Sequence, residues 1–134
     1  MIFNVSEAAN LAIHALTYLA NNPDLQPIST GQVAEALNAS DNHLSKVFQR
    51  LTKVGLVKSI RGPRGGFYLA WDPKDITLLE VYEAIDGVLG KDSCLLGHPS
   101  CDRKSCVFGD LVSDIQVQVN NHFSKTTLGD LVES

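Results

Sequence analysis

Apolar residues recur at helical spacing along most of the chain, in stretches that polar breaks separate. The first stretch follows Ser6, a residue type that caps helices, and ends before the breaker at residues 21–23, so it predicts an amphipathic helix facing the core. A second, short helix is predicted after Ser29, because Gln32 stands three residues later, as in a capping box. The chain is therefore expected to open with a long helix and a short one.

The third stretch has the most regular pattern. It follows a cap at Ser40, stops at Gly55, and has its apolar positions at Leu44, Val47, Phe48, Leu51 and Val54. Together with the short helix before it, this stretch predicts a helix-turn-helix. The face opposite the apolar stripe presents side chains that can each donate a hydrogen bond to a base edge or a phosphate, and none of them is acidic. The predicted contacts are Asn42, His43, Lys46, Gln49, Arg50 and Lys53, with Ser40 near the helix start.

Two runs of strand-favouring residues, 56–60 and 67–70, flank a turn rich in glycine and proline, which predicts a β-hairpin, or wing. The tip carries Arg61 and Arg64 among glycines, so the backbone can approach a narrow surface while two guanidinium groups reach outward. Such a tip suits contacts to the minor groove or to the DNA backbone. The alternative is an ordinary exposed hairpin whose arginines serve only solubility.

The rest of the chain predicts two more helices. One opens at Thr77, with Glu80 in capping-box spacing, and closes at Gly87. The other runs from about residue 108 to 123, and a long terminal helix with one apolar side more often packs against a second copy than stands alone. Its apolar positions are Leu111, Val112, Ile115, Val119 and Phe123.

These elements define a mainly α fold with a small β-hairpin wing. We expect a winged helix-turn-helix DNA-binding domain at residues 1–88 and a cysteine loop at residues 89–107. A dimerisation helix with a C-terminal tail is expected at residues 108–134. The chain length fits one compact module with an appended helix.

The charge is unevenly distributed. The formal net charge is −4, yet residues 40–66 carry six basic side chains against one acidic side chain, a net +5. The other five basic and fourteen acidic residues leave −9 elsewhere. Such a split is expected when one face meets nucleic acid and the rest keeps the protein soluble, although composition alone would favour a chance solvated charge run.

The cysteines are the second unusual feature. The opening lacks the basic start and apolar core of a signal peptide, and no uncharged apolar run approaches the length of a membrane span, so we expect a cytoplasmic protein without membrane contact. All three cysteines, Cys94, Cys101 and Cys106, lie within residues 92–106. In a reducing compartment an odd, clustered set of thiols indicates metal ligation or redox chemistry more than a disulfide.

The residues leave the chemistry of that loop open. Soft thiolates suit an iron-sulfur cluster, and a bending loop can bring separated ligands together. Zinc could take the three thiolates with His98 as a tetrahedral set. Metal-free thiols could sense oxidants. On these residues alone, the cluster and zinc stand almost level.

Three stretches together resemble the Rrf-two family of winged-helix transcription regulators: "ANLAIHALTYLA", "SDNHLSKVFQRLTKVGLVKSIRGPRGGFYLA" and "ITLLEVYEAIDG". The resemblance covers almost the whole chain, and the cysteines before a long helix are typical of its cluster-binding branch. It implies a homodimer on a pseudo-palindromic double-stranded DNA operator. It also implies a 2Fe-2S or 4Fe-4S cluster and a regulator, expected to be a repressor, that senses redox state, nitric oxide or iron-sulfur status.

The fourth cluster ligand departs from the family pattern. Some members place a histidine three residues after the third cysteine, where this chain has Gly109, and others use an aspartate in the partner's first helix, where it has Asn10. The remaining candidates are Glu7, His98 and Asp110. Alternatives to the cluster remain a zinc-binding or a metal-free, thiol-based redox-sensing regulator.

A different class of function is an electron-transfer or catalytic metalloprotein with the winged fold used only for protein contacts. The sequence contains no H-E-x-x-H motif, no glycine-rich nucleotide loop after a strand, and no paired carboxylates placed with a nucleophile. We therefore expect no enzymatic activity.

Overall fold

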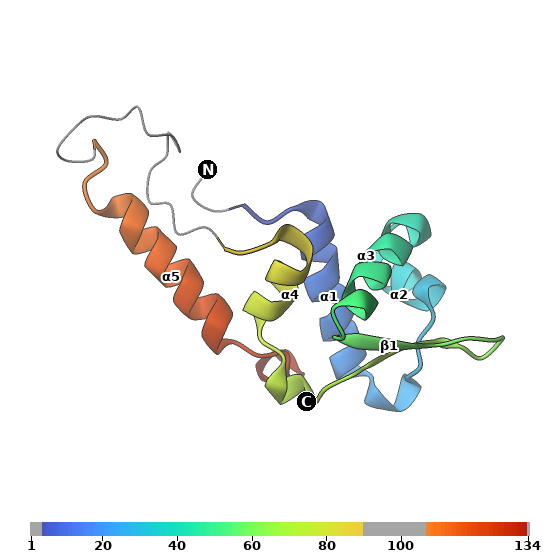
Figure 1. Cartoon of the computed structure of the whole chain (residues 1–134). Helices are drawn as coiled ribbons and strands as arrows, with labels where there is room; N and C mark the ends of the chain where they lie inside the picture. Colours follow the sequence, from blue (N-terminus) through green and yellow to red (C-terminus); the bar gives the residue numbers. More distant parts are fainter. Residues whose placement is uncertain (1–3, 90–106, 134) are drawn as a thin grey trace.

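The computed structural model describes residues 4–89 and 107–133, so the three cysteines lie outside the described residues (Figure 1). The helices are α1 (Glu7–Asn21), α2 (Thr30–Leu37), α3 (Asp41–Lys53), α4 (Leu78–Asp86) and α5 (Leu111–Lys125), and the strands are β1 (Val57–Ile60) and β2 (Gly66–Leu69). Short 3-10 turns lie at Pro23–Leu25, Pro73–Asp75 and Gly129–Leu131. The predicted fold class, mainly α with a two-stranded wing, is confirmed.

Hydroxyl side chains cap four of the helices, as the sequence predicts. The side chains of Ser6, Ser29, Ser40 and Thr77 each accept a hydrogen bond from the backbone N–H three residues on. These bonds satisfy amide groups that a helix start leaves without partners. At α2 the box is complete, because the side chain of Gln32 accepts in turn from the backbone N–H of Ser29.

The core lies between α1 and the helices packed on it. α1 contacts α2, α3, α4 and β2. Its inner face is lined by fully buried alanines and leucines, and the small alanines let neighbouring helices come close. Buried side chains of α3 and α4 complete the same cluster, so one hydrophobic core holds the helix-turn-helix and α4 as a unit. The fully buried members on α1, α3 and α4 are Ala9, Ala12, Ala15, Leu16, Leu19, Leu44, Phe48, Leu51 and Val81.

The wing is an antiparallel hairpin. Val57 pairs with Leu69 at its base and Ile60 with Gly66 near its tip. Ile28, just before α2, adds a further bridge: its N–H and C=O both bond to the backbone of Phe67, at 2.9 and 2.8 Å. The wing is thereby joined to the start of the helix-turn-helix.

α5 begins later than predicted. The expected start at about residue 108 fails because Gly109 takes a positive φ of 62°, a conformation outside the right-handed helix. Figure 1 shows α5 on the far side of α4 from α2 and α3. Phe123 packs edge-on against Tyr82 of α4, with ring centroids 5.6 Å apart. The buried face of α5 is Val112 and Gln116.

The segment after α5 returns to the winged domain. Leu128 donates its N–H to the carbonyl oxygen of Ile76, Leu78 donates to that of Thr126, and Leu128 is fully buried. The C-terminal residues thus contribute to the core beside the start of α4. No helix in the described part of the chain is long and apolar enough to span a bilayer.

Candidate nucleic-acid interface

The turn between α2 and α3 is short and depends on one residue. Asn38 ends α2 in the left-handed region, with φ 53° and ψ 48°, a conformation that asparagine tolerates better than most residues. The next residue, Ala39, donates its N–H to the carbonyl oxygen of Ala34. The chain can then turn at once into the Ser40 cap of α3, which gives the predicted helix-turn-helix.

α3 has one buried and one exposed face. Leu44, Val47, Phe48 and Leu51 are buried, as predicted. Among the predicted contact residues around this helix, His43 is half-buried. The others are exposed: Ser40, Asn42, Lys46, Gln49, Arg50 and Lys53. The prediction that Val54 joins the buried stripe is wrong, because the helix ends at Lys53 and the Val54 side chain is 53% exposed.

Contacts at the middle of the wing fix its position relative to α3. The rings of Phe48 and Phe67 stack with centroids 4.3 Å apart and planes 9° apart. A Cβ atom at Gly66 would stand 2.5 Å from the carbonyl carbon of Ile28, so glycine alone lets the two backbones come this close. Ile28 was not predicted as a wing contact, although an apolar residue just before a helix cap was a usable signal.

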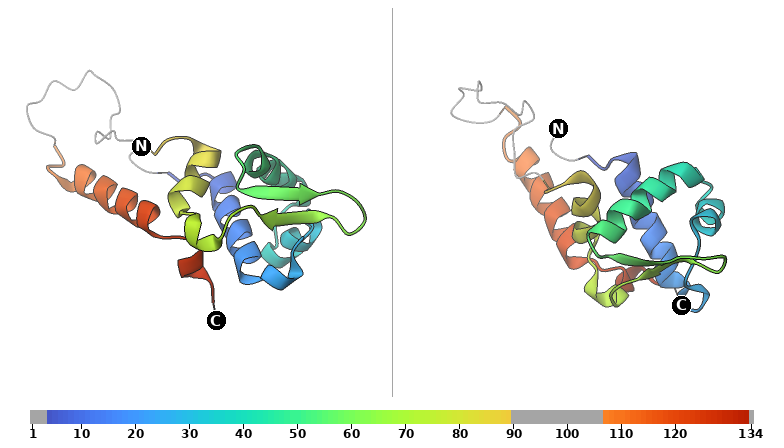
Figure 2. Two further views of the ribbon diagram at one scale, coloured as in Figure 1. Left: turned by 60° about the horizontal axis from the view of Figure 1, so that its bottom comes forward. Right: turned by 45° about the vertical axis from the view of Figure 1, so that its right-hand side comes forward.

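The wing tip holds its arginines on a glycine turn. The N–H of Gly65 bonds to the carbonyl oxygen of Gly62 at 2.9 Å, and a Cβ at Gly65 would stand 2.1 Å from the carbonyl oxygen of Ile60. Both Arg61 and Arg64 are exposed. Figures 1 and 2 show the hairpin projecting beyond the helices, so the tip can reach a partner without obstruction from them.

Arg50 differs from the other basic residues of α3. Its Nη2 donates a hydrogen bond to the carbonyl oxygen of Ile85, 2.5 Å away in the last turn of α4. A cation is favourable there, because carbonyl groups at a helix C-terminus lack amide partners. This contact was not predicted from the sequence; it gives Arg50 a structural role, although the residue as a whole is exposed.

Three of the candidate metal ligands lie in the described part of the chain. Cys94, Cys101, Cys106 and His98 lie outside the described residues. Of the other candidate ligands, Glu7 and Asn10 are exposed in the first turns of α1, and Asp110 is exposed just before α5. Within the described ranges no group of three or more His, Cys, Asp or Glu side chains is placed to hold a metal ion.

The donors that the chain offers still fit a metal centre by their chemistry. Three thiols with an exposed carboxylate within the same module match the ligand preferences of iron-sulfur clusters and of zinc. Because Glu7 and Asp110 are both exposed, neither would have to leave the core to bind a metal.

Comparison with known proteins gives one consistent answer. The sequence profile of the Rrf2 (Rrf-two) family, described as iron-dependent transcriptional regulator, matches residues 5–134. The HTH-type transcriptional regulator IscR of Klebsiella pneumoniae is 32% identical over 124 residues, covering 92% of this chain and 76% of that protein.

Two solved structures have the same fold. CymR of B. subtilis, described as the global cysteine regulator, superposes with a TM-score of 0.80 at 27% identity, covering 96% of this chain and 95% of CymR. IscR of T. potens superposes with a TM-score of 0.75 at 26% identity, covering 96% and 85%. The relatives are DNA-binding transcriptional regulators and not enzymes, as the sequence predicted. The chain belongs to the Rrf2 family of winged-helix transcriptional regulators.

Proposed function

We propose that the chain binds a double-stranded DNA operator with α3 in the major groove and the wing tip on the flanking backbone or minor groove. The observation that carries this proposal is the pairing of an exposed, non-acidic polar face on α3 with two exposed arginines on a wing held by the Phe48–Phe67 stack. Because the distance between α3 and the wing is fixed, both can contact one duplex without a loss of conformational entropy in the wing on binding.

The contact residues divide by chemistry. Asn42, His43, Lys46 and Gln49 can donate to base edges, and Ser40 lies at the helix start that faces a groove in helix-turn-helix proteins. Arg50 and Lys53, near the other end of α3, are assigned to phosphates. Asp41 would repel phosphate and has no assigned contact.

We further propose that the active form is a homodimer joined through α5. Leu111 and Ile115, one turn apart on α5, are 57% and 36% exposed, and Phe108 just before the helix is 50% exposed. An exposed apolar surface of this kind is expected to be covered by another protein surface. A second copy, related by a two-fold axis, would give two reading heads for a pseudo-palindromic operator.

The cysteine loop is proposed to hold a 2Fe-2S or 4Fe-4S cluster through Cys94, Cys101 and Cys106. The fourth ligand would come from Glu7, Asn10, His98 or Asp110. The iron-dependent description of the family and the likeness to IscR support a cluster. Bound there, the cluster would supply a centre sensitive to redox state, nitric oxide or iron-sulfur status, and the chain would act as a repressor.

Two alternatives for the same loop have support of their own. The likeness to CymR, a cysteine regulator by its description, favours metal-free thiol sensing. Zinc fits three thiolates with His98.

Anaerobic purification separates the three possibilities. We expect a coloured dimer with stoichiometric iron and sulfide, and a Mössbauer spectrum that gives the cluster type. Cys101→Ala should lose the colour, whereas His122→Ala on α5 should keep it. Colourless protein with stoichiometric zinc, or with neither metal, would contradict the cluster.

A further inference from the structure

The last turn of α4 is held from two sides, by α3 and by the start of α1. On one side, Nη2 of Arg50 donates to the carbonyl oxygen of Ile85 at 2.5 Å. On the other side, the carboxylate of Asp86 accepts from the backbone N–H of Ser6 at 3.0 Å and from the hydroxyl of the same residue. Ser6 is itself the N-cap of α1, because its hydroxyl oxygen accepts from the N–H of Ala9. The end of α4 therefore connects α1 with α3.

These two contacts meet in one peptide unit. The carbonyl group of Ile85 and the backbone nitrogen and Cα of Asp86 belong to the same planar peptide, which partial double-bond character keeps rigid. A shift of the Asp86 backbone must therefore move the oxygen to which Arg50 donates. This oxygen can accept from a side chain because α4 ends at Asp86, and the last carbonyl groups of a helix lack amide partners.

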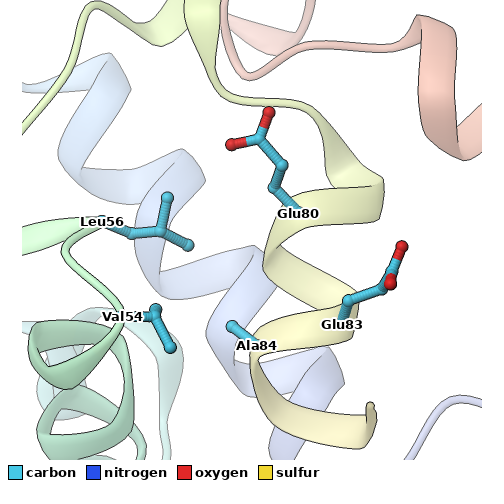
Figure 3. Close-up of a pocket in the computed structure, with 5 residues that line it drawn as sticks. All are labelled: Val54, Leu56, Glu80, Glu83 and Ala84. Atoms are coloured by element: carbon cyan, nitrogen blue, oxygen red, sulfur yellow. The ribbon is translucent and has the colours of Figure 1, made fainter. Parts of the chain in front are cut away.

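Packing between α3 and α4 is incomplete beside this contact. A cavity of about 390 Å³ lies between Val54, just after α3, and Ala84 of α4, with Leu56 at the base of the wing. Figure 3 shows Val54 and Leu56 across the gap from Ala84. Ala84 directly precedes Ile85, so the hydrogen bond from Arg50 lies next to the gap. Because the two helices do not pack closely at this point, we expect the hydrogen bond to orient the Arg50 side chain.

Arg50 lies at the edge of the face of α3 that is proposed to contact DNA. It follows Lys46 by four positions, so the two side chains are neighbours on one surface of the helix, and both are exposed. A guanidinium group has five N–H donors, so one can stay on Ile85 while others bind a phosphate. A cation that is already held in place loses less conformational entropy when the phosphate binds.

We propose that Asp86 is a positioning residue for DNA binding: its hydrogen bonds to Ser6 fix the Ile85 carbonyl group, which orients Arg50 toward a phosphate. The role of Asp86 rests on the proposed contact of Arg50 with DNA. It is opposite to what charge alone predicts, because removing a negative charge ordinarily strengthens binding to a polyanion. The sign of the change in DNA affinity therefore separates a positioning role from simple repulsion.

The DNA affinity of full-chain variants tests this role, by fluorescence anisotropy on a duplex that the wild-type protein selects from a random pool. Asp86→Ala removes the charge and both hydrogen bonds with Ser6, and we expect about threefold weaker binding. Asp86→Asn removes the same charge but keeps an oxygen that can accept from the Ser6 N–H, so it should lose less affinity. Glu80→Gln, which removes an exposed acidic charge from the same helix, should bind at least as tightly as the wild type.

The same measurement in an Arg50→Ala background tests the route. Asp86→Ala should cause no further loss there, because the side chain that it positions is absent. Arg50→Ala alone should reduce the slope of log affinity against log salt by about 0.9. Circular dichroism shows whether each variant is folded, and Asp86→Asn replaces Asp86→Ala in both backgrounds if the alanine variant is not.

Two results would overturn the role of Asp86 while leaving the DNA contact of Arg50 in place. One is an Asp86→Ala affinity equal to or above that of the wild type, and the other is an equal loss in the wild-type and Arg50→Ala backgrounds. An unchanged salt slope in Arg50→Ala would instead contradict the phosphate contact of Arg50, and the role of Asp86 would fail with it.

Discussion

Phe48 of α3 and Phe67 of β2 stack with ring centroids 4.3 Å apart and planes only 9° apart, although they lie on elements with different periodicity. Phe48 is fully buried, and the backbone of Phe67 also pairs with Ile28. The stack therefore fixes the wing to α3 and to the segment that enters α2. The stack holds as a unit the two surfaces that we propose contact one DNA duplex.

Replacing Phe67 by leucine tests this role. The substitution keeps an apolar side chain but removes the stacking, so we expect a loss of about 1 kcal/mol in the free energy of unfolding. The loss of DNA affinity should exceed that of Arg64→Ala, because the whole wing loses its fixed position. Urea unfolding and fluorescence anisotropy measure the two effects. Tyr68→Leu, at the next position of β2, is the control. Equal DNA affinities of the two leucine variants would contradict the role of the stack.

The wing-tip arginines are expected to contact phosphates. Arg64→Ala should reduce the slope of log affinity against log salt by about 0.9, since each neutralised phosphate releases counterions. A mixed-sequence duplex is sufficient, because phosphate contacts do not depend on sequence. Lys74→Ala, at an exposed residue in the Pro73–Asp75 turn, is the matched loss of a basic charge. An unchanged slope in Arg64→Ala would remove this residue from the interface.

Arg50 should affect stability as well as binding. Arg50→Ala removes the hydrogen bond from Nη2 to the carbonyl oxygen of Ile85, and we expect about 1 kcal/mol less stability because the pair is only partly shielded from water. Lys53→Ala, in the same last turn of α3, should leave stability within about 0.5 kcal/mol. Thermal unfolding in one buffer measures both. Equal melting temperatures for the two variants would show that the contact contributes nothing.

Tyr82 makes the stability of the fold depend on pH in the alkaline range. Burial, and then the charges of Asp86 and Glu83, raise the pKa of Tyr82 above its ordinary value of 10.0. Its hydroxyl donates to the carbonyl oxygen of Asn4 at 2.9 Å. The unfolded chain then loses this proton at lower pH than the folded one, so the contribution is complete below about pH 10 and is lost as pH rises through the higher folded pKa.

Above about pH 10, the stability of Tyr82→Phe should therefore change less with pH than that of the wild type. It should also be less stable near neutral pH by about 1 kcal/mol, through the lost hydrogen bond. Urea midpoints across the alkaline range measure both effects, with Tyr68→Phe as control. Parallel pH profiles for wild type and Tyr82→Phe would contradict the assignment.

Local signals predicted most of the fold. The caps at Ser6, Ser29 and Ser40 act within three residues, and the apolar stripe of α3 faces inward because its spacing allows only one buried face. The positive φ of Gly109, which delays α5, has no distinct signal in the sequence, since glycine takes both signs of φ.

Contacts between distant residues could not be predicted in the same way. The pairing of Ile28 with Phe67 and the bond from Arg50 to Ile85 depend on how whole elements pack. So does the cavity lined by Val54, Leu56 and Ala84, which needs both the early end of α3 and the side of α4. The predicted contact residues of α3 are exposed, except the half-buried His43, because they share the face opposite the buried stripe.

The most direct test of the DNA-binding proposal is the affinity of the Gln49→Ala variant for the operator, compared with its affinity for unrelated DNA. The operator is selected from random duplexes with the wild-type protein, and affinity is then measured for it and for a scrambled duplex. Gln49 is exposed on α3 and uncharged. We predict that the substitution lowers the ratio of specific to non-specific affinity about tenfold, with non-specific affinity and thermal stability unchanged. An unchanged ratio would contradict the account that the outer face of α3 reads the operator.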